Sequence, residues 1–311
     1  MLSFTAKDID GAQIELDNPL KVIINIDENA PADDLTVTFP LIEQMPELKS
    51  ITVTDNGKIV FSGPVDEQQS FIGSDGSYTR IIARSMAANL LDNESKPVSY
   101  TKPSASVIFR RHLLNNGIYS YKGGDIVMKG GLNIPKGTTD WQAFASFCLA
   151  TVGVVPRIEP DGTADFYGVE NDMKLRFSNT DGISYISVKE NNLHCKLISD
   201  VFVRLNDIDG YTVDIDDDDA KLRGIKRRRY LDASGTTSPM VGDKIIKNAR
   251  KNSYEVTVVT TKPLLDALGA SAEVDCGLKL KDGLYVSSIY YSLSPDGEYT
   301  SLKLRRSQRY P

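Results

Sequence analysis

The chain has 311 residues, of which 41% are hydrophobic and 25% are charged, and its formal net charge at pH 7 is −6. This balance is ordinary for a soluble globular protein of two or three domains, and it excludes a chain that is disordered over a long range. No apolar run is long enough to span a bilayer and the first twenty residues hold several charges, so we expect no membrane span, no signal peptide and synthesis in a cytoplasm.

The charge is unevenly distributed along the chain. Residues 1–100 carry 7 Lys and Arg against 16 Asp and Glu, whereas residues 101–311 carry 29 against 26. A protein that reads nucleic acid usually has a concentrated basic face. The N-terminal third shows the opposite and would repel a polyanion.

The first part of the chain has the pattern of short strands. Lys21–Ile26 is rich in β-branched residues, and apolar residues alternate with threonines over 35–39. Asn56-Gly57 supplies the two positive-φ positions of a type I′ turn and predicts a hairpin, and 78–84 predicts a further strand. Several short strands with almost no helix predict a small barrel or sandwich before residue 85.

Residues 95–170 have the pattern of a small α+β insert. One or two helical turns are expected around Met86, Ala87, Leu90 and Leu91, and the polar stretch 93–102 is a domain boundary. Ser104 can cap a helix that ends at Asn115-Asn116-Gly117. The apolar face of that helix is expected to consist of Val107, Ile108 and Leu114.

The stretch Thr138–Gly168 predicts a helix followed by a hairpin. Thr138, Thr139 or Asp140 can cap a helix that starts near Trp141 and ends at Gly153. Pro160-Asp161-Gly162 has the residues of a tight turn between two strands. The predicted apolar stripe of the helix comprises Trp141, Phe144, Ala145, Cys148, Leu149 and Val152, and we interpret Trp141, Phe144 and Cys148 as core.

After Asp172 the pattern is again that of strands. Val201, Val203 and Leu205 alternate with polar residues, and a long hairpin is expected about Pro295-Asp296-Gly297. The predicted fold class is therefore α+β, mainly β, with two small β-barrel domains and an α+β insert between them. The predicted domains are 1–95 for the first barrel, 96–172 for the insert and 173–311 for the second barrel.

Two charged runs are candidate binding sites in the last domain. Asp216–Asp219 offers four adjacent acids, which lack the alternating ligands, glycine and distal glutamate of a calcium loop, so a solvated turn is the simpler interpretation. Lys226–Arg229 could contact phosphates, but a charged edge strand or a contact with an acidic protein is favoured.

Other residues are candidates for catalysis. His194 and Cys195 are adjacent and would point to opposite faces of a strand, and the three cysteines have no CxxC spacing and are expected to be buried hydrophobes. Paired carboxylates near a turn would suit a hydrolase. These carboxylates are Glu159, Asp161 and Asp165. We assign no catalytic, cofactor-binding or metal-binding residue, expect no cofactor, and predict that the protein is not an enzyme.

Two segments resemble those of the hub proteins of contractile phage tails and tail-like particles, the late control D or PBSX-type hub family, which is related to the hub part of type VI secretion spike proteins. The first matching segment comprises Gly57, Phe61, Gly63, Val65, Arg84, Ala88, Leu91 and Asp92. The second comprises Thr139, Trp141, Phe147, Cys148, Gly153, Pro156, Asp161, Gly162 and Thr163.

The resemblance implies a structural baseplate hub in a virion, prophage or tail-like particle, assembled in the cytoplasm of a bacterial host. It implies a homotrimer whose six barrels form a pseudo-sixfold ring between a hexameric tail tube and a trimeric spike, with other baseplate proteins as further partners. DNA would be a partner only in passage through the channel, which the acidic N-terminal domain suits. The alternatives are a tail-associated cell-wall hydrolase and a host-surface or glycan-binding module that exposes Tyr119, Tyr121, Tyr290 and Tyr291.

Overall fold

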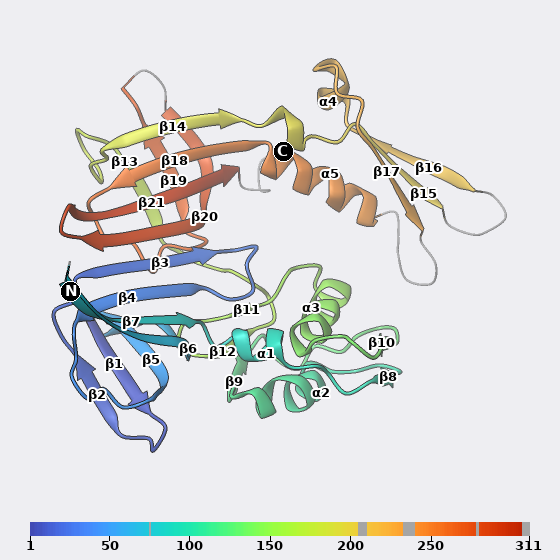
Figure 1. Cartoon of the computed structure of the whole chain (residues 1–311). Coiled ribbons are helices and arrows are strands. Elements are labelled where there is room, and N and C mark those ends of the chain that lie inside the picture. The colour runs from blue at the N-terminus through green and yellow to red at the C-terminus, as the bar shows by residue number, and fades with distance from the viewer. Residues whose placement is uncertain (75, 205–209, 233–239, 278–279, 307–311) are drawn as a thin grey trace. The chain divides into compact units, whose positions relative to one another are not determined.

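The computed structural model of the chain divides into two compact units (Figure 1). It describes residues 1–74, 76–204, 210–232, 240–277 and 280–306. The first unit comprises Met1–Met173, Thr260–Ala270 and Ser287–Ser301. The second comprises Lys174–Val259, Ser271–Val286 and the chain from Leu302 onward.

The first unit is built on an antiparallel sheet with the strand order β20-β3-β4-β7-β6-β5-β1-β2. The predicted strand at Lys21–Ile26 is confirmed as β3, and its alternate residues Val22, Ile24 and Ile26 are buried. The strands are β1 (Leu2–Asp8), β2 (Gln13–Leu16), β3 (Lys21–Asp27), β4 (Asp34–Pro40), β5 (Leu48–Asp55), β6 (Lys58–Gly73), β7 (Gly76–Arg84) and, shared with the second unit, β20 (Leu280–Ser294).

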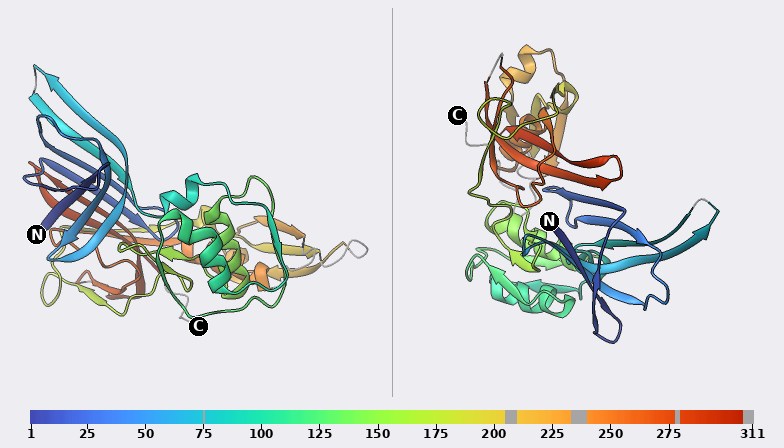
Figure 2. Two further views of the ribbon diagram at one scale, coloured as in Figure 1. Left: turned by 90° about the horizontal axis from the view of Figure 1, so that it is seen from below. Right: turned by 90° about the vertical axis from the view of Figure 1, so that its left-hand side faces the viewer.

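The predicted hairpin at Asn56-Gly57 is confirmed as the connection between β5 and β6. Asn56 has φ 48° and Gly57 has φ 83°, the two positive values that a type I′ turn requires. A bulge between Val65 and Glu67 interrupts the pairing of β6 with β7. Before the bulge β6 pairs with β5, and beyond it β6 pairs with β7 alone. The end of β6 and the start of β7 therefore form a ribbon that projects beyond its neighbours in both views of Figure 2.

A small α+β part of the first unit lies between β7 and Phe166, and it has its own core. Phe166 is at its centre, with ring centroids 4.8 Å from Phe144 and 5.8 Å from Phe147. Its short strands form two small sheets, β10-β8 and β11-β12-β9. The elements are α1 (Ala88–Asp92), β8 (Val98–Tyr100), α2 (Ala105–Ile108), β9 (Ser120–Lys122), β10 (Leu132–Ile134), α3 (Asp140–Thr151), β11 (Arg157–Ile158) and β12 (Thr163–Asp165).

Helix α3 confirms the predicted start and end. The Thr139 side chain caps it by accepting a hydrogen bond from the Gln142 amide, the Gln142 side chain accepts from the Thr139 amide, and Gly153 follows its last residues with φ 78°. The core residues predicted on this helix, Trp141, Phe144 and Cys148, are buried. The wider stripe is wrong at Leu149, which is 49% exposed, and it omits Phe147, which is fully buried. The buried face therefore centres on the side of the helix toward Phe166.

The helix predicted after Ser104 changes its winding part-way. Four residues of α2 are followed by a π-helical turn, Phe109–Leu113, and a 3₁₀ turn, Leu114–Asn116, which ends at Gly117 as expected. One additional residue in a π-turn shifts the buried face along the chain. Leu114, expected in the apolar face, is therefore 37% exposed, and Leu113 is buried in its place.

The second unit contains two sheets. One has the order β14-β18-β21-β20-β19-β13, and the other is a three-stranded sheet, β16-β15-β17, packed against α5. Leu205, part of the predicted alternation, lies outside the described residues. The further elements are β13 (Lys174–Phe177), β14 (Ser187–Asn192), β15 (Asp200–Arg204), β16 (Tyr211–Asp216), α4 (Asp218–Leu222), β17 (Arg228–Asp232), α5 (Met240–Asn252), β18 (Tyr254–Thr260), β19 (Ser271–Asp275) and β21 (Gly297–Arg306).

The predicted fold class, α+β and mainly β, is confirmed. In the described residues no strand pairing closes a sheet into a barrel, so barrel closure stays a prediction, as do the domain limits 1–95, 96–172 and 173–311. Across the same residues, no helix combines the length and the apolar character needed to cross a bilayer.

Candidate functional site

The paired carboxylates near the Pro160 turn all have structural partners. Asp161 Oδ1 accepts a hydrogen bond from the Thr163 amide at 2.9 Å, as the turn requires. Lys122 lies 3.4 Å from Glu159 and 3.0 Å from Asp165, whose side chain is buried. The hydrogen bond with Asp165 is the main cause that raises the pKa of Lys122. One ammonium group therefore holds two of the three carboxylates.

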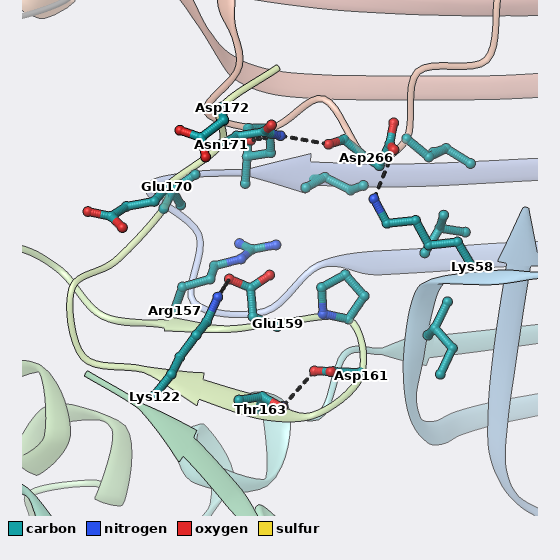
Figure 3. A pocket seen from close by; sticks show the side chains of 17 residues that line it. Lys58, Lys122, Arg157, Glu159, Asp161, Thr163, Glu170, Asn171, Asp172 and Asp266 are labelled. Atoms are coloured by element: carbon teal, nitrogen blue, oxygen red, sulfur yellow. Dashed lines mark hydrogen bonds and ion pairs between the residues drawn. The ribbon is translucent and has the colours of Figure 1, made fainter. Parts of the chain in front are cut away.

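Lys122, Glu159 and Asp161 line an open pocket of about 790 Å³ in the first unit (Figure 3). Several segments meet there: the start of β6, the β11–β12 hairpin, the chain at 169–172 and the loop at 265–268, together with Ile26 of β3 and Lys122 of β9. The Lys58 ammonium group binds the Asp266 carboxylate at 2.9 Å. The side-chain amide of Asn171 donates hydrogen bonds to the backbone carbonyl oxygens of Asp266 and Leu268 at 2.8 and 3.0 Å. These bonds fasten the loop to the rest of the unit.

Arg157, which also lines the pocket, belongs to a buried ion pair. Arg157 and Asp33 are 5% and 3% exposed, and the guanidinium donates to Asp33 Oδ2 and to the Asp27 carbonyl. Burial is the largest influence on Asp33 and raises the pKa of its carboxyl group, against the effect of Arg157. The pair joins β11 to the loop before β4. The Ser85 hydroxyl oxygen also contacts this loop, because it accepts a hydrogen bond from the backbone amide of Asp33 at 3.0 Å.

The pocket is lined by both charged and apolar side chains. Its lining contains neither histidine nor cysteine. In the part of the chain that the structure describes, no group of three or more His, Cys, Asp or Glu side chains could hold a metal ion. The polar and charged side chains of the pocket join segments of the chain through ion pairs and hydrogen bonds.

Sequence reasoning missed a buried polar network around His112. Its Nδ1 lies 2.8 Å from Ser95 Oγ and 2.9 Å from Asp140 Oδ1, and its Nε2 lies 2.9 Å from the Tyr100 hydroxyl. Burial favours a neutral Asp140, but hydrogen bonds from His112, Asn116 and Ser95 outweigh it and lower the pKa of Asp140. The residues of this network are far apart in the sequence, so only folding brings them together.

The other histidine and the cysteines form no catalytic pair. His194 and Cys195 lie in a 3₁₀ turn, His194–Lys196, rather than on a strand. Cys195 is exposed, so its expected burial is wrong, whereas Cys148 is buried and burial raises the pKa of its thiol. All three cysteines, including the partly buried Cys276, are free thiols.

The acidic run Asp216–Asp219 is divided among different structural contacts. Asp217 caps α4 by accepting from the Ala220 amide at 3.0 Å, and both of its oxygens accept from Arg250 at 2.7 Å. Asp216 pairs with Lys221 at 2.9 Å. The run therefore combines a helix cap with two ion pairs.

The basic run Lys226–Arg229 leads into β17, an edge strand of the three-stranded sheet. Arg228 and Arg229 are exposed on this strand. The interpretation as a charged edge strand thus agrees with the structure.

Only part of the tyrosine set could serve as an exposed binding surface. Tyr119 is 79% exposed, but Tyr291 is 1% exposed and its hydroxyl donates to Glu298 at 2.7 Å. Tyr121 packs between Phe109 and Phe166, with ring centroids at 4.7 and 5.4 Å. The proposed exposure of Tyr291 is therefore wrong, because it belongs to the buried face of β20.

Two residues of the family resemblance form an ion-pair cluster instead of a reactive site. The Arg84 guanidinium binds Asp66 at 2.8 and 2.9 Å and Asp92 at 2.7 and 3.1 Å. The hydrogen bond with Arg84 is the main influence that lowers the pKa of Asp92. This cluster ties β7 to β6 and to the end of α1.

Comparisons with known proteins identify the fold. No protein-family model matches the sequence, and no curated protein matches it. The structure is similar to the tail protein from Neisseria meningitidis MC58, with a TM-score of 0.78, 18% identity and coverage of 98% of this chain and 96% of that chain. It is also similar to the 43 kDa tail protein of prophage MuSo2 from Shewanella oneidensis, with a TM-score of 0.77, 14% identity and coverage of 98% and 97%.

A more distant similarity leads to secretion systems. An E. coli component of the type VI secretion system, itself described as structurally similar to the T4 bacteriophage tail proteins gp27 and gp5, has a TM-score of 0.57 and 11% identity. The match covers all of this chain and 78% of that chain. The resemblance stated for the sequence is therefore confirmed at the level of the fold, since the structural neighbours are phage tail proteins and proteins related to secretion spikes.

Proposed function

We propose that this chain is the structural hub of a contractile tail baseplate, a trimeric ring that adapts a hexameric tail tube to a trimeric spike. The observation that carries the proposal is a fold shared with tail proteins over 98% of the chain at a TM-score of 0.78. Because both chains are covered almost completely, the similarity concerns the whole architecture and not one common motif.

Symmetry gives the proposed ring its purpose. A hexameric tube and a trimeric spike cannot contact one another through equivalent surfaces, because their rotational symmetries differ. A trimer in which each chain supplies two similar β-rich bodies presents six of them to the tube while keeping threefold symmetry toward the spike. The proposal is supported by the presence of a sheet in each of the two units.

A non-enzymatic role is consistent with the candidate residues. The carboxylates at the Pro160 turn are occupied by Lys122 and by the turn itself, and the buried histidine is enclosed by Ser95, Tyr100 and Asp140. The proposed partners are further copies of the chain, tail tube protein, spike protein and other baseplate proteins. The proposed location is the baseplate of a virion or tail-like particle assembled in bacterial cytoplasm.

Light scattering of the purified chain, alone and mixed with its tube and spike neighbours, tests the proposal. We expect a species of three times the mass of one chain, and joint elution with both neighbours. A strict monomer in every mixture would contradict it. Incubation with peptidoglycan provides an independent comparison, since a hub releases no soluble fragments and a cell-wall hydrolase does.

A further inference from the structure

The three-stranded sheet of the second unit carries opposite charges on its two edges. β15 is the central strand, with β16 on one side and β17 on the other. In the described residues of the sheet, neither edge strand pairs with any strand besides β15. Each edge therefore presents a row of backbone groups that can pair with another chain.

The register places the charges on one face. Asp200 of β15 is opposite both Asp216 and Arg228, and Phe202 is opposite both Asp214 and Tyr230. Residues directly opposite one another share a face of a sheet. The edge at β16 thus carries two exposed carboxylates on the same face on which the edge at β17 carries an exposed guanidinium.

The other face of this sheet is already covered. Val201 and Val203 of β15 are buried and form a core with Ile246 and Ala249 of α5. The charged face also holds exposed aromatic rings. Tyr230 is 59% exposed and its ring stacks on Phe202 with centroids 5.3 Å apart.

The difference in sign between the edges is the informative feature. Charges on edge strands normally keep copies of a protein apart. Two edges of the same sign would repel the edges of other copies, whereas a negative edge and a positive edge on one sheet attract one another between copies.

The strand directions agree with such a contact, since β16 is antiparallel to β15 and β17 is parallel to it. A copy rotated about an axis along the strands therefore brings β17 antiparallel to the next β16.

We propose that the β16 edge of one copy pairs with the β17 edge of the next copy, with Asp214 facing Arg228 across the contact. The inference rests on the proposed function, because it names a surface through which the ring of copies closes. Such a head-to-tail contact uses two different patches and forms a closed ring when the rotation between copies allows it. Tyr230 and Arg228 lie at its centre and are residue types enriched at interface hot spots.

Charge exchange tests the contact. Asp214→Arg places a second guanidinium opposite Arg228, and Arg228→Asp places a second carboxylate opposite Asp214, so each variant should assemble at least about tenfold more weakly than the wild type. The double variant Asp214→Arg/Arg228→Asp exchanges these two charges and should restore assembly. Arg229→Asp is the matched control, because it makes the same charge change on the same strand but on the face toward α5, and it should assemble nearly as the wild type does.

The readout is mass by light scattering over a concentration series, with circular dichroism melting to establish that each variant is folded. If the wild type forms trimers and both single variants form them at the same concentrations, the edge contact is wrong and the hub proposal stands. If the double variant stays as weak as the single variants, the edge contact is likewise wrong. If the wild type is a monomer at every concentration and in every mixture, the hub proposal itself fails, and the contact fails with it.

Discussion

Asp217 shows how one buried carboxylate can hold several parts of the second unit together. Its side chain is fully buried, it caps α4, and it accepts two hydrogen bonds from Arg250 of α5. Burial favours the neutral acid, but the hydrogen bonds from Arg250 and the Ala220 amide outweigh it and lower the pKa of Asp217. A sequence shows four adjacent acids and suggests a cation site, whereas the fold separates this one from its neighbours.

We predict that Arg250→Met destabilises the protein by about 1–3 kcal/mol at pH 7, less than the loss of a fully buried pair because the guanidinium is half exposed. A lowered carboxyl pKa stabilises the folded state above the unfolded pKa, and this contribution disappears as the pH falls through the folded pKa. The difference from the wild type should therefore shrink below about pH 4. Thermal melting across pH measures it, with the exposed Lys247→Met on the same helix as control; a difference that does not depend on pH would contradict the role of Asp217.

The network of His112 leads to a second prediction at the residue scale. His112→Leu leaves Asp140 and Ser95 buried without their partner and should cost about 2–4 kcal/mol, whereas Tyr100→Phe removes one hydrogen bond and should cost about 1 kcal/mol. Melting temperatures of the two variants measure this order. Equal losses would show that the ring of His112 serves mainly to fill space.

At the scale of elements, the close approach of β6 to the end of β7 depends on Gly63. A Cβ atom at this position would lie 1.9 Å from the Arg84 carbonyl oxygen, which is backbone and cannot turn away. Gly63→Ala should therefore destabilise the first unit by about 3 kcal/mol or more and also disturb the Arg84 cluster.

Gly124→Ala is the matched control for this change. Gly124 has φ +68° but no atom within 4 Å of the added Cβ, so it isolates the cost of backbone strain, about 1 kcal/mol. Chemical denaturation followed by circular dichroism compares the two variants. A loss at Gly63 no larger than that at Gly124 would mean that the strands can move apart without cost.

Elements defined by local chemistry could be predicted from the sequence. The Asn56-Gly57 turn and the Thr139 cap depend on residues within a few positions of one another, and both were predictable. The burial of Phe147 rather than Leu149 could not be derived from spacing, because it depends on where Phe166 packs. The site residues were harder still, since the bond between His112 and Asp140 joins residues 28 positions apart.

At the scale of the whole molecule, the residues of the family resemblance can be compared with the contacts that they make in the structure. The resemblance in sequence named individual motif residues, and several of them, such as Arg84, Gly63 and Asp161, proved to fix strand contacts or turns. The proposed structural role would require such residues, because positions that hold the geometry of a ring have to be specified as strictly as catalytic residues.

The proposed ring makes a stoichiometric prediction. If three chains present six similar bodies to a tube of sixfold symmetry, a complex reconstituted with tube protein should contain two tube chains for each hub chain, and a complex with spike protein should contain one. Native mass spectrometry measures both ratios. The Arg228→Asp variant is the control: if it cannot close the ring, it should fail to nucleate a tube hexamer while its melting temperature stays close to that of the wild type. One tube chain for each hub chain would contradict the pseudo-sixfold arrangement, because each chain would then offer the tube a single binding surface.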